Sequence, residues 1–101
     1  MKTIECLSKR IDEEINDSIA YAKLALENKD TNPWLAKIYH DLSDEEYRHM
    51  EILHGAVTRV IKDYREANGE PPSAMLAVYD YLHGQQIEKA ETAKRYQAMF
   101  R

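Results

Sequence analysis

The segment 42-LSDEEYRHMEIL-53, from Leu42 to Leu53, is the most informative part of this chain. At about 100° per residue, a helix through it and its flanks gathers one stripe of side chains. The members of the stripe are Tyr39, Leu42, Glu46, His49, Leu53, Ala56 and Val60. It is apolar except at Glu46 and His49, whose i, i+3 spacing directs both side chains to one spot. The pattern predicts a helix whose inner face holds a carboxylate and an imidazole.

Length and punctuation predict a single all-α domain over residues 1–101 with three long helices. We expect these helices over 3–28, from 33 to about 67, and from 73 onward. Pro33 suits the first turn of the second helix, Gly69 ends it, and Ser73 is the expected N-cap of the third. No stretch alternates apolar and polar residues as a half-buried strand would.

Composition excludes several classes of protein. The formal net charge is −4, and Lys and Arg form no run longer than two residues, so we expect no nucleic-acid partner. Neither a signal peptide nor an 18-residue apolar run is present, so we expect no membrane partner and a cytoplasmic location. Cys6 is the single cysteine, which excludes an intrachain disulfide and a cysteine-based zinc or rubredoxin-type iron site.

Glu14 is a second carboxylate on an apolar arc, that of the first predicted helix. It lies about 21 Å from the end of that helix near Asn28, and Glu46 lies about 20 Å from the start of the next near Pro33. In an antiparallel pair these matching heights bring Glu14, Glu46 and His49 together. Unpaired buried carboxylates cost several kcal/mol, and a cation removes that cost. Two carboxylates and an imidazole suit Fe(II), Mn(II) or Zn(II).

One chain offers three ligands and three helices, which is too few for a closed two-metal site or a four-helix bundle. A two-fold dimer supplies four helices, four Glu and two His, the ligand count of the di-iron carboxylate bundles. The pattern therefore predicts a homodimer or higher homo-oligomer that holds two divalent cations per dimer, which are iron, manganese or zinc. Dimerisation would complete the four-helix bundle.

The same residues resemble a known family. The first helix is similar to that of the rubrerythrin-like ferritins at Glu14, Tyr21, Ala22 and Ala25. The second resembles theirs at Leu35-Ala36 and at Glu45-Glu46-Tyr47-Arg48-His49. One Glu helix and one Glu-x-x-His helix in a chain near 100 residues is similar to the encapsulated ferritins, half-bundles of the ferritin-like superfamily that dimerise. The resemblance covers about residues 10 to 60.

The resemblance implies a ferroxidase-type oxidoreductase that oxidises Fe(II) to Fe(III) between subunits. It implies Glu14 and Glu46 as carboxylate ligands, one of them bridging, and His49 as the nitrogen ligand. Tyr21 would lie near the metals as a hydrogen-bond partner or electron donor, so these four residues form the expected catalytic group. An encapsulin shell would be a partner of such a protein, although no targeting tail is recognisable after Phe100-Arg101. The third helix has no counterpart in the resemblance.

Two other functions fit the same pattern. The first is rubrerythrin-like peroxide reduction, which would need an external electron donor because the chain lacks rubredoxin cysteines. The second is a metal-free helical interaction or structural module, in which Glu14, Glu46 and His49 form a polar network. If the inward-facing stripe of the second helix has been assigned wrongly, Glu46 and His49 lie instead on an exposed turn. The corresponding alternative for Glu14 is an ordinary ion pair.

The remaining polar residues have plainer expected roles. His40 and His54 lie off the stripe by more than about 80°, so we expect them in solvent. Trp34 is expected to anchor the start of the second helix in the core. His83 follows Asp80 at i, i+3 as a faint copy of the main motif. We expect surface positions for the acids that flank the ligands and would attract cations, namely Glu13, Asp17 and Glu45.

Overall fold

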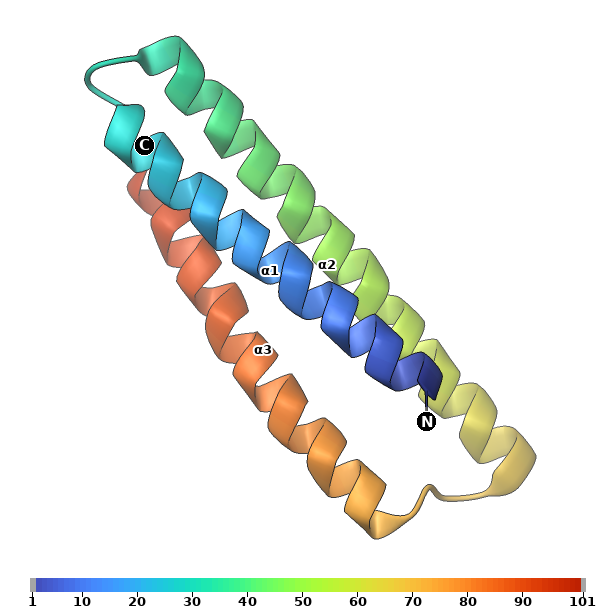
Figure 1. Cartoon of the computed structure of the whole chain (residues 1–101). Coiled ribbons are helices and arrows are strands. Elements are labelled where there is room, and N and C mark those ends of the chain that lie inside the picture. Colours follow the sequence, from blue (N-terminus) through green and yellow to red (C-terminus); the bar gives the residue numbers. More distant parts are fainter. Residues whose placement is uncertain (1, 101) are drawn as a thin grey trace.

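The computed structural model describes residues 2–100, which form three helices: α1 (Lys2–Asn28), α2 (Pro33–Asn68) and α3 (Ser73–Met99). α1 and α2 form an antiparallel hairpin, and α3 runs back alongside it, parallel to α1 (Figure 1). The bundle measures 55 × 18 × 18 Å. Within residues 2–100 there is no strand, so the all-helical prediction is confirmed. None of the helices in this range is long and apolar enough to cross a membrane.

The ends of α2 lie close to where the turn residues predict them. Pro33 occupies the first turn, where its missing N–H is not needed, and the carbonyl of Asn32 accepts the N–H of Ala36 at 3.0 Å. At the other end Gly69 has φ 78°, a conformation that side chains disfavour, and its N–H donates to the carbonyl of Arg65 at 2.9 Å. Local chemistry alone thus sets the length of this helix.

The start of α3 differs from the prediction by one residue. Pro72, not Ser73, occupies the N-cap position. The carbonyl of Pro72 accepts the N–H groups of Met75 and Leu76 at 3.0 and 3.1 Å. Because proline itself lacks an N–H and favours the extended conformation, it ends the linker and lets Ser73 begin the helix.

Small side chains allow α1 and α2 to approach closely at the centre of their contact. The Ser18 hydroxyl donates to the Ser43 carbonyl at 2.9 Å, and the Ser43 hydroxyl donates to the Ser18 carbonyl at 2.7 Å. These reciprocal bonds from one side chain to the opposite backbone are possible only where nothing bulky separates the helices. The small residues buried along the same contact are Ala22 and Ala25 of α1 and Ala36 of α2.

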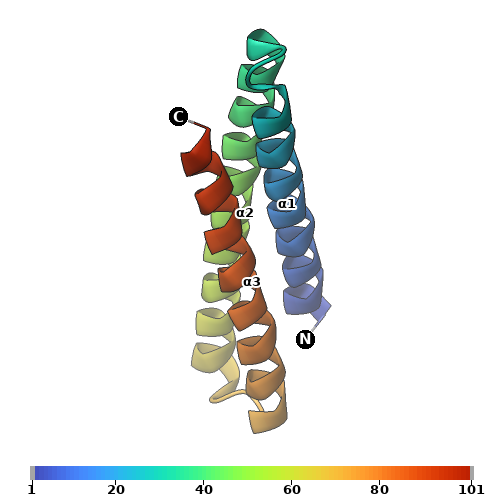
Figure 2. The same ribbon diagram turned by 90° about the vertical axis from the view of Figure 1, so that its left-hand side faces the viewer.

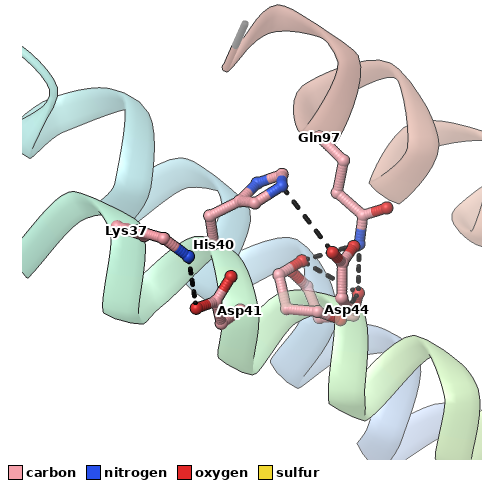
Figure 3. A network of polar contacts seen from close by, with 7 residues as sticks. Lys37, His40, Asp41, Asp44 and Gln97 are labelled. Carbon is pink, nitrogen blue, oxygen red and sulfur yellow. Dashed lines mark hydrogen bonds and ion pairs between the residues drawn. The ribbon is translucent and has the colours of Figure 1, made fainter.

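α3 covers one side of this hairpin and packs more on α1 than on α2 (Figure 2). Gln97 reaches from α3 toward the serine pair, and its Nε2 donates to the Ser43 hydroxyl at 2.8 Å (Figure 3). Gln86 Nε2 donates to Ser8 Oγ at 3.0 Å and Asp12 Oδ1 at 3.3 Å. The larger apolar core side chains are Ile11, Ile15, Met50 and Val57.

The buried line of α2 has a different phase from the expected stripe, so that part of the prediction was wrong. The buried residues are spaced by seven and comprise Ala36, Ser43, Met50 and Val57. Met50 lies about 100° around the helix from His49, and Ser43 about 60° from Glu46. Leu42 and Leu53 of the expected stripe are only half-buried. The helices turn their small residues inward because these permit the closest contact, so the larger residues stand at the edge.

Three further expectations are corrected. Trp34 does not anchor the core, because 67% of it is exposed. His40 and His54 are not in open solvent, because both are half-buried on the side of α2 that α3 covers. The His40 ring stacks on Phe100 with 4.4 Å between centroids, and the His54 ring stacks on His83 at 4.8 Å. Their positions depend on where α3 docks, which helix periodicity within α2 does not show.

Candidate metal centre

Three potential ligands meet between α1 and α2. Glu14, Glu46 and His49 each offer one ligand atom, and these atoms all lie within 4.8 Å of one another. His49 Nδ1 is 3.6 Å from Glu14 Oε2 and 3.7 Å from Glu46 Oε2. The predicted convergence of the three side chains is therefore confirmed as geometry, while their metal-binding role stays a prediction.

The register that brings them together is held one turn away by the serine pair. Ser18 follows Glu14 by four residues on α1, and Ser43 precedes Glu46 by three residues on α2. Because Ser18 and Ser43 hydrogen-bond reciprocally, the two helices cannot slide along each other without breaking both bonds. The carboxylates of Glu14 and Glu46 consequently stay at the same height.

The site lies at the edge of the helix contact, in partly screened surroundings. The side chains of Glu14 and Glu46 are 26% and 21% exposed, whereas that of His49 is 53% exposed. Glu14 Oε2 is buried and has no hydrogen-bond partner. The distances to His49 are too long for hydrogen bonds, so the imidazole does not satisfy it. A buried carboxylate oxygen without a donor in its own chain calls for an ordered water, a cation or a group from another chain.

The donor set fits a divalent transition metal. Zinc sites are tetrahedral, with bonds of about 2.0–2.2 Å to nitrogen and carboxylate oxygen, so two ligand atoms on one ion stand about 3.4 Å apart. His49 Nδ1 lies 3.6 and 3.7 Å from the two carboxylate oxygens. Side-chain shifts of about 1.4 Å would bring the full spread of 4.8 Å to the tetrahedral span. Carboxylate oxygens with one imidazole nitrogen suit Fe(II), Mn(II) and Zn(II) alike. The residues thus fit the metal without selecting among these three ions.

The centre faces away from α3, on the open side of the hairpin. Asp12 faces α3, because it accepts a hydrogen bond from Gln86. Glu14 lies about 200° away from Asp12 around α1. Tyr47 likewise faces α3, where Lys94 Nζ sits 4.0 Å from its ring centroid, and His49 lies about 200° away around α2. No part of α3 therefore covers the three ligands.

Three exposed apolar side chains lie along the same side of α2 as His49. Ile38 lies within about 20° of His49 around the helix, and Ile52 and Trp34 within about 60°. Ile38 is 47% exposed, Ile52 65% and Trp34 67%. Ile52 is one turn from His49, whereas Ile38 and Trp34 lie about 16 and 22 Å along the helix from it. Large exposed apolar side chains along one helix face favour a surface that another chain covers.

Tyr21 lies on the ligand side of α1, two turns beyond Glu14. Its ring stacks on Tyr39 of α2, with 6.1 Å between centroids and 26° between planes. Within residues 2–100, Tyr21 makes no hydrogen bond to Glu14, Glu46 or His49, so its expected role at the metal stays a prediction. Tyr39 is the neighbour to which sequence analysis assigned no role. Tyr39 precedes Glu46 by seven residues, just as Tyr21 follows Glu14 by seven. This repeated spacing is the feature of the sequence that could have predicted the stacking of the two tyrosines.

The other candidate residues lie outside the ligand group, as expected for residues with a minor role. The flanking acids Glu13, Asp17 and Glu45 are exposed. Glu13 pairs with Arg10 at 3.3 Å. His83, the faint copy of the motif, stacks against His54 and Tyr79 on the opposite side of α2 from the centre. The structure therefore brings neither these acids nor His83 into the ligand set.

No family model matches the chain, and neither a curated protein nor a solved structure is significantly similar to it. The resemblance to ferritin-like proteins therefore stays a prediction from residue pattern.

Proposed function

We propose that this chain binds Fe(II) at Glu14, Glu46 and His49 and oxidises it to Fe(III), with dioxygen or peroxide as the electron acceptor. The single observation behind the proposal is the buried Glu14 Oε2, which has no hydrogen-bond partner and lies 3.6 Å from His49 Nδ1 beside a second carboxylate. A divalent cation would satisfy that oxygen and offset the repulsion between the two carboxylates. Iron is the substrate in this proposal.

A second copy of the chain completes the centre. Two copies supply four carboxylates and two imidazoles, and the four negative charges balance two divalent cations. The exposed side chains of Trp34, Ile38 and Ile52 support this arrangement, because they lie along the same side of α2 as His49. The proposed assembly is a ferritin-like four-helix bundle made from the α1–α2 hairpins of two chains.

The chain's own groups have distinct roles in the proposed reaction. Each Fe(II) releases one electron, so two ions reduce dioxygen and two protons to hydrogen peroxide. Glu14 and Glu46 hold the two ions close together, and His49 supplies a neutral nitrogen ligand that fixes the position of an ion. The half-exposed edge at His49 leaves a route for iron and oxidant, and the exposed acids Asp17 and Glu45 attract cations toward it.

Anaerobic titration with Fe(II) should show saturation near one iron per chain and a rise in melting temperature, because the metal binds only the folded protein. Admission of air should then produce the ultraviolet absorbance of Fe(III). A peroxide reductase would also bind Fe(II), but peroxide would then oxidise the bound iron faster than dioxygen does. An added external reductant would sustain its turnover. Protein that stays colourless with an unchanged melting temperature would identify a metal-free helical module.

Ile52→Glu should convert the assembly to monomers and abolish iron oxidation, because a charge would be placed at the centre of the proposed contact. Tyr81→Glu is the matched control: Tyr81 is 67% exposed and Ile52 65%, but Tyr81 lies on α3, away from the centre. Analytical ultracentrifugation and an oxidation assay measure both outcomes. A dimer that tolerates Ile52→Glu but is lost on Tyr81→Glu would place the subunit contact on α3 and contradict the proposed centre.

A further inference from the structure

Three of the chain's four histidines lie where α2 meets α3 and its C-terminal end, apart from the candidate metal centre. Each has a buried ring nitrogen with no hydrogen-bond partner: His40 Nδ1, His54 Nε2 and His83 Nδ1. Neutral imidazoles tolerate such a position better than imidazolium ions do, because both nitrogens of a charged ring carry N–H groups that need acceptors. The contact between α2 and α3 therefore depends on rings that acid can charge.

His54 and His83 form the central pair of this contact. Their rings are nearly parallel, with 4.8 Å between centroids and 18° between planes, and the Tyr79 ring stacks on His83 at 5.6 Å. The two imidazoles border a cavity of about 240 Å³ whose other lining residues are Ile11, Met50, Gln86, Ile87 and Ala90. Apolar side chains predominate there, so an added charge would be poorly solvated.

No counter-charge on any packed helix compensates the pair. On α1 the facing carboxylate is Asp12, which accepts a hydrogen bond from Gln86 at 3.3 Å. On α3 the exposed Asp80 acts on Tyr79, and on α2 the exposed Glu51 acts on Tyr47. Within residues 2–100, the histidines that form ion pairs with carboxylates are His40 and His49, not His54 or His83.

We propose that His54 and His83 form a proton-sensitive clasp, in which protonation of the stacked pair releases α3 from α2. The rings are stacked, and the lone pairs of an imidazole lie in its ring plane, so the two point side by side and do not converge on a common metal ion. Charging either ring would put an imidazolium against another imidazole in an apolar cavity. Release would begin in the part of α3 near His83 and uncover the core side chains Ile11 and Met50.

The direction of the pH effect follows from His54. Burial, and then the neighbouring His83, lower the pKa of His54 below its ordinary value of 6.5. Above that value the ring is neutral whether α3 is docked or released. As the pH falls below it, the released form takes up a proton that the docked form resists, so docking is progressively lost. The loss ends once the docked form is protonated as well.

Amide hydrogen exchange, corrected for the intrinsic effect of pH, tests the clasp on the intact chain. Between about pH 7.5 and pH 5 we expect protection of residues 73–90 to fall by at least about threefold. Protection at the centre of the α1–α2 contact should change much less. Protection of α3 that is independent of pH, or a parallel loss in all three helices, would overturn the proposal.

Variants separate protonation from packing. His54→Phe/His83→Phe retains two stacked rings without titrating nitrogens and should keep α3 protected at about pH 5. Tyr79→Phe is the matched control, because it preserves the ring on His83 and should release α3 as the wild type does. If the double variant does not fold, an NMR titration of His54 in the wild type decides, since a pKa at or above that of a free histidine would overturn the clasp. Zn²⁺-induced protection of α3 that His54→Phe abolishes would also overturn it, in favour of a metal site.

Discussion

Glu46→Gln is expected to lower the initial rate of Fe(II) oxidation by at least about a hundredfold. Changing a residue that only supports a metal ligand already costs up to about a hundredfold, and Glu46 is a proposed ligand itself. The amide keeps the size of the side chain but removes its charge and one strong acceptor oxygen. Because Glu46 contributes twice to the proposed two-chain centre, one substitution removes two of the four carboxylates. Stopped-flow absorbance at the Fe(III) band measures the rate.

The neighbouring residue provides the control for this change. Glu45→Gln removes the same charge from the same turn of α2, but Glu45 is exposed and outside the ligand group. It should retain nearly full activity at saturating iron. His49→Ala should behave like Glu46→Gln, and circular dichroism should show unchanged helicity in all three variants. Equal rates for Glu46→Gln and Glu45→Gln would reject the centre.

Ser43→Leu is expected to destabilise the protein by about 3 kcal/mol or more, because two effects combine. The larger side chain would force α1 and α2 apart where Ser43 is fully buried. It would also remove the hydroxyl that donates to the Ser18 carbonyl at 2.7 Å and accepts from Gln97 at 2.8 Å. Urea unfolding followed by circular dichroism measures the change in the free energy of unfolding.

Thr58→Leu is the matched control for that substitution. Thr58 lies on the same helix and its hydroxyl also bonds to a backbone carbonyl, that of His54 at 3.2 Å, but it is exposed. We expect a change within about 0.5 kcal/mol, as for other surface positions. If Ser43→Leu were equally mild, the close contact at the serine pair would not determine the register of the two helices. The common height of Glu14 and Glu46 would then need another cause.

The candidate centre and the histidine clasp share no residue and lie on different faces of α2, so each has its own test. Iron binding concerns the open side, where Glu46 and His49 meet Glu14. The clasp concerns the covered side, where His54 meets His83. Failure of iron oxidation would leave the pH dependence of α3 protection unaffected, and the converse also holds.

Local chemistry along the chain is enough to predict the helices and the heights of the ligands. Pro33 and Gly69 mark the ends of α2 through interactions that involve only their immediate neighbours. A short connection between α1 and α2 then sets how far each residue lies from the turn, since every helical residue adds about 1.5 Å. For this reason the matching heights of Glu14 and Glu46 follow from the amino-acid sequence alone.

The rotation of each helix about its axis, in contrast, is settled only when the three helices pack together. Residue spacing shows which side chains share a face, but the face turned inward depends on all the neighbours at once. Large apolar residues such as Leu42 and Leu53 predict one rotation of α2 about its axis. The structure has another rotation, because Ser43 permits the closest contact with α1. The same rotation left His49 at the open edge and turned His54 toward α3. Close packing between backbones is a property of the assembled helices, and the periodicity of one helix does not contain it.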